Sequence, residues 1–307
     1  MKWLAAFVVV LVVLLSVPVW APNFWVSVGI QTMIFATFAM SLDLVLGYGG
    51  LPTLGHAALY GAGAYAYAFW AVRFEPSLPM LLLTGMAGGA VVALLIGGLA
   101  LRARGIYFLM LTLSLGQILW ALAAQWTEVT GGTDGLNGVA RPSIPVLFDV
   151  MGSLRAFYVL VVLIAAVGFV VLTVLVRSPF GRTLEGAREN ERKMSAMGYP
   201  VLRYRLAAFV IAGALAGIAG ASTAAFNFAA TPGLLFWTTS GLVLVSVVLG
   251  GTRSLVGPVI GALVIQLLLV ALPSITERWQ MAIGAVCIAV VLLLPRGLAR
   301  LPRRLKA

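Results

Sequence analysis

A stretch rich in arginine and glutamate carries the residues most suited to specific chemistry. It reads SPFGRTLEGARENERKMSAMGYPVLRYRLAAF from Ser178. Pro179 and Gly181 favour a break after the preceding helix, and residues 182–197 are predicted to form a new one that ends at Gly198. Its spacing places four apolar side chains on one face. These are Leu184, Ala187, Met194 and Met197.

Two interpretations of this amphipathic helix stay open. It could lie at the lipid interface, where its cations would meet anionic headgroups. Alternatively, it could be a coupling helix that docks its apolar face into a groove of a cytoplasmic partner. The interleaved acids and arginines favour ion pairing over a catalytic cluster.

A glycine-rich run from Gly47 to Gly63 is the second feature with chemical potential. Small residues let helix backbones approach closely in lipid, so close packing is one interpretation. The other is an interrupted helix that lines a solute path, where free backbone groups could meet a zwitterion. A later Gly250-Gly251 pair echoes this run. The candidate solute-path residues are Gly49, Gly50, Thr53, Gly55, His56, Gly250 and Gly251.

Isolated ionisable residues complete the inventory. Asp43 lies inside an apolar run, where an acid usually pairs or faces water, and we expect a structural role for it. His56 is expected to be a hydrogen-bonded packing residue. With one histidine and one cysteine, Cys287, we predict no metal site and no disulfide. Because no Gly-Lys pair exists, the chain lacks a P-loop and cannot itself be an ATPase.

The composition of the chain indicates that membrane-spanning helices position these residues. Of the 307 residues, 62% are apolar and 9% are charged, which is too little polar surface for a soluble globule. We therefore predict an all-α integral membrane protein, residues 1–307 forming one polytopic helical domain of about ten spans, with eight possible. The predicted spans are 3–21, 25–47, 53–72, 78–101, 105–126, 156–176, 205–228, 236–252, 256–273 and 279–295.

The net charge of +11 has an uneven distribution that predicts orientation. Lys and Arg gather in residues 102–104, 177–205 and 296–306, and basic loops stay in the cytoplasm. Both termini and the loop 177–204 are therefore predicted to be cytoplasmic, and the loop 127–155 external. Long uncharged runs separate the basic residues, so nucleic-acid binding is not expected, whereas contact with membrane lipid is.

Several blocks together resemble a known family. The loop from Ser178 and the span after it are similar to the coupling loop region of branched-chain amino acid ABC-importer permeases, of the LivM-like type. LGYGGLPTLGHAALYGAGAYA from Leu46, RGIYFLMLTLSLGQ from Arg104, GGTDGL from Gly131 and SVVLGGTRSLVGPVIGA from Ser246 resemble other family blocks in the same order.

The resemblance implies a bacterial inner-membrane importer for branched-chain or other apolar amino acids, with urea or amides as other solutes of related permeases. Its partners would be a second, LivH-like permease, two ATP-binding cassette subunits and a periplasmic or extracellular solute-binding protein. ATP and Mg would be used by the ATPases, and this chain would bind no cofactor. The implied external gate is Thr133 and Asp134. The implied ATPase-coupling residues are Leu184, Arg188, Glu189, Asn190, Glu191, Met194 and Gly198.

The alternative function is an ion-coupled secondary transporter that works alone. Such a protein usually carries acids or polar clusters within its spans to bind the ion, and here only Asp43 qualifies. A membrane-embedded enzyme would need converging catalytic side chains at one membrane face, and the sequence suggests none.

Overall fold

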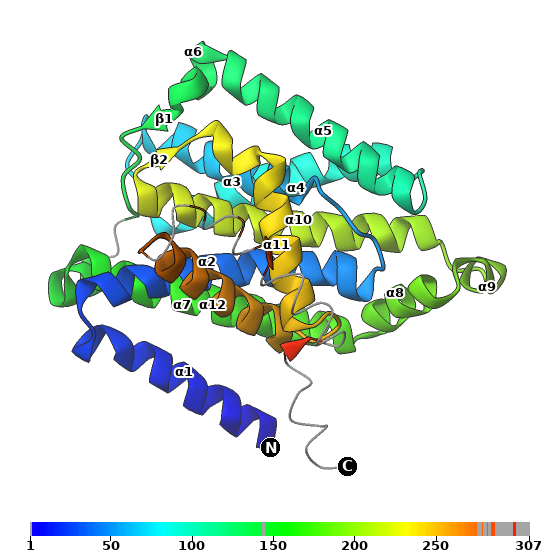
Figure 1. Cartoon of the computed structure of the whole chain (residues 1–307), viewed down its shortest axis with the longest axis horizontal. Coiled ribbons are helices and arrows are strands. Elements are labelled where there is room, and N and C mark those ends of the chain that lie inside the picture. Colours follow the sequence, from blue (N-terminus) through cyan, green and yellow to red (C-terminus); the bar gives the residue numbers. More distant parts are fainter. Residues whose placement is uncertain are drawn as a thin grey trace.

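The computed structural model describes residues 2–142 and 145–274, together with the single positions 278, 281, 284, 285, 297 and 298. The described part is almost entirely helical (Figure 1). Its first half contains α1 (Lys2–Trp20), α2 (Asn23–Asp43), the π-helical turn η1 (Leu44–Tyr48), α3 (His56–Ala71), α4 (Leu78–Ala100), α5 (Ile106–Gln125), α6 (Thr127–Thr130), the short turn η2 (Gly132–Asp134) and β1 (Leu136–Asn137). Its second half contains α7 (Pro145–Arg177), α8 (Pro179–Glu189), α9 (Glu191–Ala196), α10 (Val201–Asn227), β2 (Ala229–Ala230), the short turn η3 (Pro232–Leu235), α11 (Trp237–Gly250), α12 (Val256–Ala271) and the short turn η4 (Leu272–Ser274).

Within the described residues, six helices are long and apolar enough to cross a membrane. The class of multi-pass helical membrane protein is therefore confirmed. Shorter apolar helices, Val9–Trp20 and Trp237–Gly250, correspond to the first and eighth predicted spans. The third predicted span, 53–72, corresponds to α3, which has 16 residues. The structure describes only single positions of the tenth predicted span, 279–295, and of the basic tail, so the span count and the side on which the termini lie stay predictions. The six long helices are Asn23–Tyr48, Leu78–Ala100, Ile106–Gln125, Leu154–Arg177, Val201–Asn227 and Val256–Ser274.

The centre of the bundle is built by close backbone contact between α3, α4 and α10. A Cβ atom placed on Gly217 of α10 would fall on the carbonyl oxygen of Gly85 in α4, and one on Gly63 of α3 would fall on the backbone of Gly217. Glycine at these crossings lets three helices share one packing layer, as is typical of helices in lipid. The packing interpretation of the glycines therefore holds at this centre.

Helix α2 lies beside this centre and contacts α7, α10, α11 and α12 (Figure 1). From Ala36 to Val45 every side chain is buried. Because it is enclosed by helices from both halves of the chain, α2 is placed to connect distant parts of the molecule.

The predicted helix over residues 182–197 is wrong in one respect, because two helices occupy this segment. Asn190 adopts an extended backbone between α8 and α9, and its Oδ1 accepts a hydrogen bond of 3.0 Å from the N–H of Lys193. Asparagine favours such a cap over a place inside a helix. The chain folds back here, so that Met194 lies against Gly186. Gly198, with a φ of +87°, has the expected left-handed backbone after α9.

Substituting Gly217 with alanine tests the central crossing. The added methyl group would overlap the Gly85 carbonyl, so Gly217→Ala is expected to lose about 1–3 kcal/mol of stability by overpacking. Thermal unfolding of the detergent-solubilised protein measures the loss. Gly98→Ala in α4 is the control, because a Cβ there meets nothing within 4 Å. It should leave the unfolding temperature unchanged or higher, and equal losses in both variants would contradict the packing assignment.

Candidate functional site

Asp43, at the end of α2, is fully buried and ties two distant segments together. Its Oδ1 accepts a hydrogen bond of 3.0 Å from the backbone N–H of Arg253, in the loop between α11 and α12. Arg253 has a φ of +63°, a left-handed conformation that turns its N–H toward the carboxylate. Oδ2 finds no hydrogen-bond partner among the described residues. The expected structural role of Asp43 thus has a concrete form.

The glycines beside Asp43 make this approach possible. A Cβ on Gly47 would collide with Asp43 Oδ1 and would lie 2.9 Å from the Arg253 nitrogen. On the other segment, a Cβ on Gly250 would fall on the carbonyl oxygen of Gly257 in α12. Both positions need a residue without a side chain, because backbone and carboxylate fill the space.

Helix α8 contacts both segments that Asp43 joins, and an arginine takes part in each contact. Arg188 donates a hydrogen bond from Nη1 to the carbonyl oxygen of Gly47, and its side chain lies over Gly50. Glu185 of α8 pairs with Arg253, with 3.5 Å between Oε1 and Nη2. We name Asp43, Gly47, Glu185, Arg188 and Arg253 the α8 cluster. It joins the two glycine motifs and the predicted coupling loop in one contact region.

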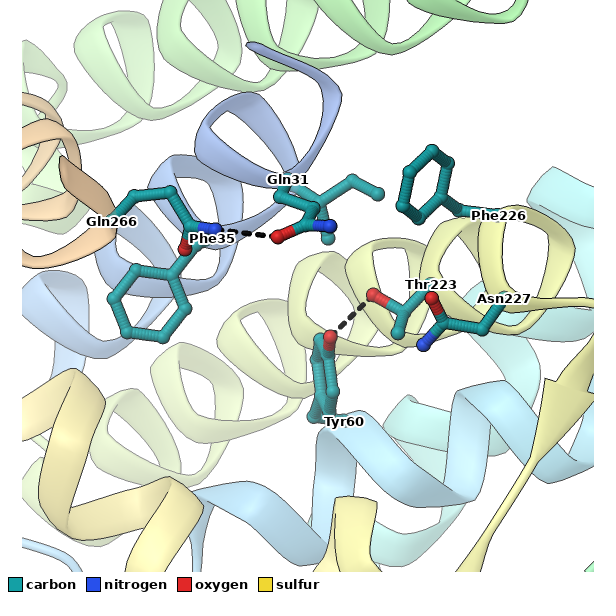
Figure 2. Close-up of a pocket in the computed structure, with 8 residues that line it drawn as sticks. Gln31, Phe35, Tyr60, Thr223, Phe226, Asn227 and Gln266 are labelled. Atoms are coloured by element: carbon teal, nitrogen blue, oxygen red, sulfur yellow. Dashed lines mark hydrogen bonds between the residues drawn. The ribbon is translucent and has the colours of Figure 1, made fainter. Parts of the chain in front are cut away.

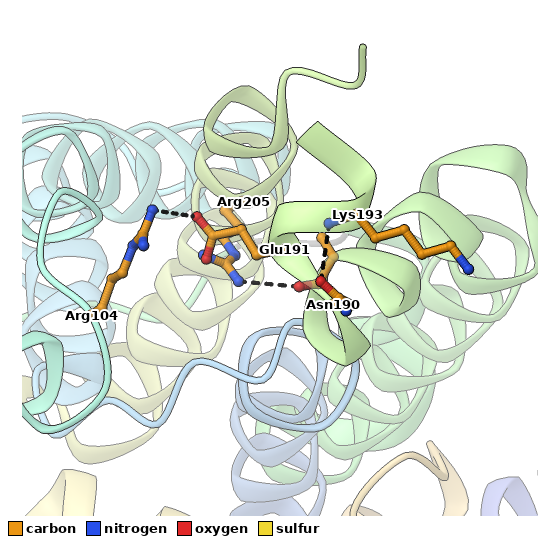
Figure 3. A network of polar contacts seen from close by, with 6 residues as sticks. Arg104, Asn190, Glu191, Lys193 and Arg205 are labelled. Carbon is orange, nitrogen blue, oxygen red and sulfur yellow. Dashed lines mark hydrogen bonds and ion pairs between the residues drawn. The ribbon is translucent and has the colours of Figure 1, made fainter. Parts of the chain in front are cut away.

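A second set of ion pairs holds the bend between α8 and α9 (Figure 3). Glu191 accepts from Arg205 of α10 at 2.8 Å and from Arg104 before α5 at 3.1 Å. Arg205 also donates to the carbonyl oxygen of Ala187 at 3.3 Å. Arg104 is exposed, so its pair with Glu191 contributes about 0–1 kcal/mol, whereas Arg205 and Glu191 are partly buried. The main consequence of both pairs is to fix the position of the bend. They place the basic segments around 104, 188–205 and 253 at one end of the bundle.

The predicted coupling residues divide into buried and accessible ones. Leu184 is fully buried and belongs to the core, so it faces the chain itself rather than its surroundings. Met194 and Glu191 are half-buried. Arg188, Glu189, Asn190 and Gly198 are exposed at the α8–α9 end. Contact of this set with an ATPase stays a prediction, and Arg188, Glu189 and Asn190 at the bend are exposed.

The predicted solute-path residues lie next to the α8 cluster and are mostly buried. His56 Nε2 and the Ser41 hydroxyl lie 2.9 Å apart and share a hydrogen bond, which agrees with the expected packing role. A Cβ on Gly55 would meet the carbonyl oxygen of Thr112 in α5. Thr53, Gly49 and Gly251 are also buried, whereas Gly50 is exposed beneath Arg188. Contact of these residues with a solute stays a prediction.

A polar pocket of about 240 Å³ lies elsewhere, between α2, α3, α10 and α12 (Figure 2). Two hydrogen bonds cross it: Gln266 Nε2 donates to Gln31 Oε1 at 2.5 Å, and the Tyr60 hydroxyl pairs with that of Thr223. Sequence reasoning missed this set, although amide side chains inside apolar spans are a readable signal. The lining residues are Gln31, Ile34, Phe35, Tyr60, Thr223, Phe226, Asn227 and Gln266.

Contacts between rings connect this pocket with the α8 cluster. Tyr60 lines the pocket and packs on Phe38 at a tilt, with 4.4 Å between ring centroids. The imidazole of His56 stacks on Phe38, with 5.4 Å between centroids. Ser41, the partner of His56, is two residues before Asp43 on α2. A continuous series of contacts therefore runs from the pocket to the cluster.

At the other end of the bundle, the predicted external loop packs on the end of α10. Strands β1 and β2 pair Leu136 with Ala230, and the Tyr67 hydroxyl donates to the Ala140 carbonyl at 2.8 Å. Arg141 lies over the rings of Phe226 and Phe228, and burial lowers the pKa of its guanidinium. Thr133 and Asp134, the predicted gate residues, are exposed in η2. Their role as a gate stays a prediction.

These features define a class: a multi-pass helical membrane protein with a pocket between four of its helices that is lined by polar and apolar side chains. A solute site between membrane helices is typical of a transport permease. Residues 24–292 match the family described as branched-chain amino acid transport system, permease component. The chain belongs to this family, as the sequence motifs predicted.

Individual relatives agree with the family match. The chain is 28% identical to the high-affinity branched-chain amino acid transport system permease protein LivM of Salmonella typhimurium, over 91% of this chain and 70% of the relative. For LivM of Escherichia coli the identity is also 28%, over 96% and 75%. A probable branched-chain amino acid transport permease protein LivH of Methanocaldococcus jannaschii is 28% identical over 62% and 60%. No solved structure matches the chain.

Replacing Asp43 tests the bond that joins α2 to the loop before α12. Asp43→Leu leaves the buried N–H of Arg253 without its acceptor and is expected to cost about 1–3 kcal/mol. Asp43→Asn retains an acceptor oxygen and should lose clearly less. Thermal unfolding of both purified variants measures the difference. If asparagine destabilised as much as leucine, the hydrogen bond would not be the source of the stability.

Proposed function

We propose that this chain is one of two translocation subunits of an ATP-driven importer for branched-chain or other apolar amino acids. The relatives named LivM and LivH support a pairing with a second, LivH-like permease. In this proposal two ATP-binding cassette subunits use ATP and Mg on the cytoplasmic side. A solute-binding protein delivers the solute at the β1 end, where Thr133 and Asp134 are exposed. The complex resides in the bacterial inner membrane.

One observation carries the proposal: helix α8 of the predicted coupling loop contacts both glycine motifs of the bundle. Arg188 binds Gly47, and Glu185 pairs with Arg253, whose N–H is held by Asp43. A push on the bend at Asn190 would thus reach the inner end of α2 and the loop between α11 and α12. An ion-coupled transporter that works alone needs no such contact, because it has no ATPase whose movement must be transmitted. Membership of the permease family also favours the importer.

We further propose a direction for the solute path. It enters at the pocket near the end of α10, passes the stack of Tyr60, Phe38 and His56, and leaves near Gly49 and Gly50. The two glycine motifs would widen or narrow this inner end as α8 moves. The chain itself performs no covalent chemistry in this account.

Removing the charge of Arg188 tests the coupling role. Arg188→Met keeps the apolar stem over Gly50 but removes the hydrogen bond to Gly47. In a reconstituted complete complex, ATP-driven leucine uptake should fall about tenfold, equivalent to ~1.4 kcal/mol, while ATP hydrolysis continues. Arg192→Met, at an exposed position of α9, is the matched control and should keep uptake. Unchanged uptake in Arg188→Met would contradict the coupling role.

A further inference from the structure

We infer that the outward side of α5 binds the second permease of the complex. This inference rests on the proposed function and adds to it the surface through which the two permeases meet. We call this surface the α5 face. Helical spacing places its residues on one side of α5: Met110, Ser114, Gln117, Ile118 and Ala121.

Helix α5 lies at the edge of the bundle that is away from α1 (Figure 1). Of the six long helices in the described residues, it is the least buried. Its inner side packs on α3, where a Cβ on Gly55 would meet the carbonyl oxygen of Thr112. On the other side Met110, Ser114 and Ile118 are exposed. The α5 face is therefore open to whatever surrounds the chain in the membrane.

The outward sides of two other long helices are apolar, as contact with lipid requires. The exposed residues of α4 from 83 to 99 are apolar or glycine. Helix α5 differs, because a hydroxyl and an amide, those of Ser114 and Gln117, stand on its outward side. On α7, by contrast, the exposed side chains between positions 163 and 174 are Leu163, Val167, Val170, Val171 and Val174.

Gln117 is the group that lipid does not satisfy. It lies about 12 Å or more from each end of α5, which is too deep for its amide to reach the lipid headgroups. The Ser114 hydroxyl donates to the Met110 carbonyl oxygen of its own helix at 3.1 Å, whereas the Gln117 amide bonds no described residue. An unpaired amide is costly in hydrocarbon. A partner that supplies a donor or an acceptor at this depth is therefore favoured.

Among the proposed partners, the second permease is the one that spans the membrane. The ATP-binding cassette subunits and the solute-binding protein act at the two membrane surfaces and do not reach the middle of α5. Amide side chains form hydrogen bonds between membrane helices, and small residues let two helices approach closely. Ser114 and Ala121, about one turn before and after Gln117, leave that space. Helix α5 would then separate the second permease from Gly55 and the candidate solute path.

Photo-crosslinking in the complete complex tests the contact. The photoreactive residue benzoylphenylalanine replaces Ile118 of the α5 face or, as the matched control, Val167 of α7, since both side chains are 62% exposed in this chain. After irradiation in proteoliposomes, we expect a covalent adduct with the LivH-like permease from position 118 and none from position 167. Mass spectrometry of the adduct identifies the attached chain.

Removing the amide gives a second, independent readout. Gln117→Met keeps an unbranched side chain of similar length but cannot bond a partner, so copurification of the LivH-like permease should fall about three- to tenfold, the effect of one hydrogen bond between membrane helices. Val167→Met on α7 should keep copurification. Thermal unfolding of the chain alone should not change in Gln117→Met, because the amide bonds no described residue.

If α5 faced lipid, removing the amide would leave copurification unchanged or raise it, and that result would overturn the inference. An adduct from position 118 with lipid alone or with a second copy of this chain would overturn it too. In each case the importer function would stand. Failure of the unaltered chain to retain the LivH-like permease would instead overturn the proposed function.

Discussion

The buried carboxylate of Asp43 is the constraint on which the arrangement depends. An acid inside an apolar bundle must find donors, and here it takes the backbone N–H of Arg253. This hydrogen bond requires a residue without a side chain at position 47 and a left-handed backbone at Arg253. Once these are fixed, the turn after α2 and the loop before α12 form one surface, and Arg188 and Glu185 of α8 bind to it.

Helix α2 connects the α8 cluster with the pocket. Helix α2 carries Gln31 at the pocket, Phe38 between the rings of Tyr60 and His56, and Asp43 in the α8 cluster. A shift of the cluster along or around the axis of α2 would thus move a wall of the pocket. Of the three helices that cross at glycines, α10 packs directly on α2.

Sequence reasoning predicted the parts that depend on local pattern. The predicted span 78–101 agrees with α4, Leu78–Ala100, and the predicted end at Gly198 agrees with its left-handed backbone. It missed what depends on distant neighbours. The break at Asn190, the burial of Leu184 and the contact between Arg188 and Gly47, 141 positions apart, arise from tertiary packing that periodicity does not report. The pocket was missed for the same reason, since its amides pair across 235 positions.

The central claim is that α8 and the glycine turn move as one body. A Cβ on Gly50 would lie 3.2 Å from the Cβ of Arg188, close to the separation of about 3.5–4.5 Å in a disulfide. The variant Gly50→Cys/Arg188→Cys, with the single native Cys287 replaced by serine, lacks the Arg188 contact with Gly47, so ATP-driven uptake by the reduced complex should be low, as in Arg188→Met. The account predicts that oxidation, which ties α8 to the glycine turn through a disulfide, raises uptake. Uptake that stays low or falls further on oxidation would contradict it.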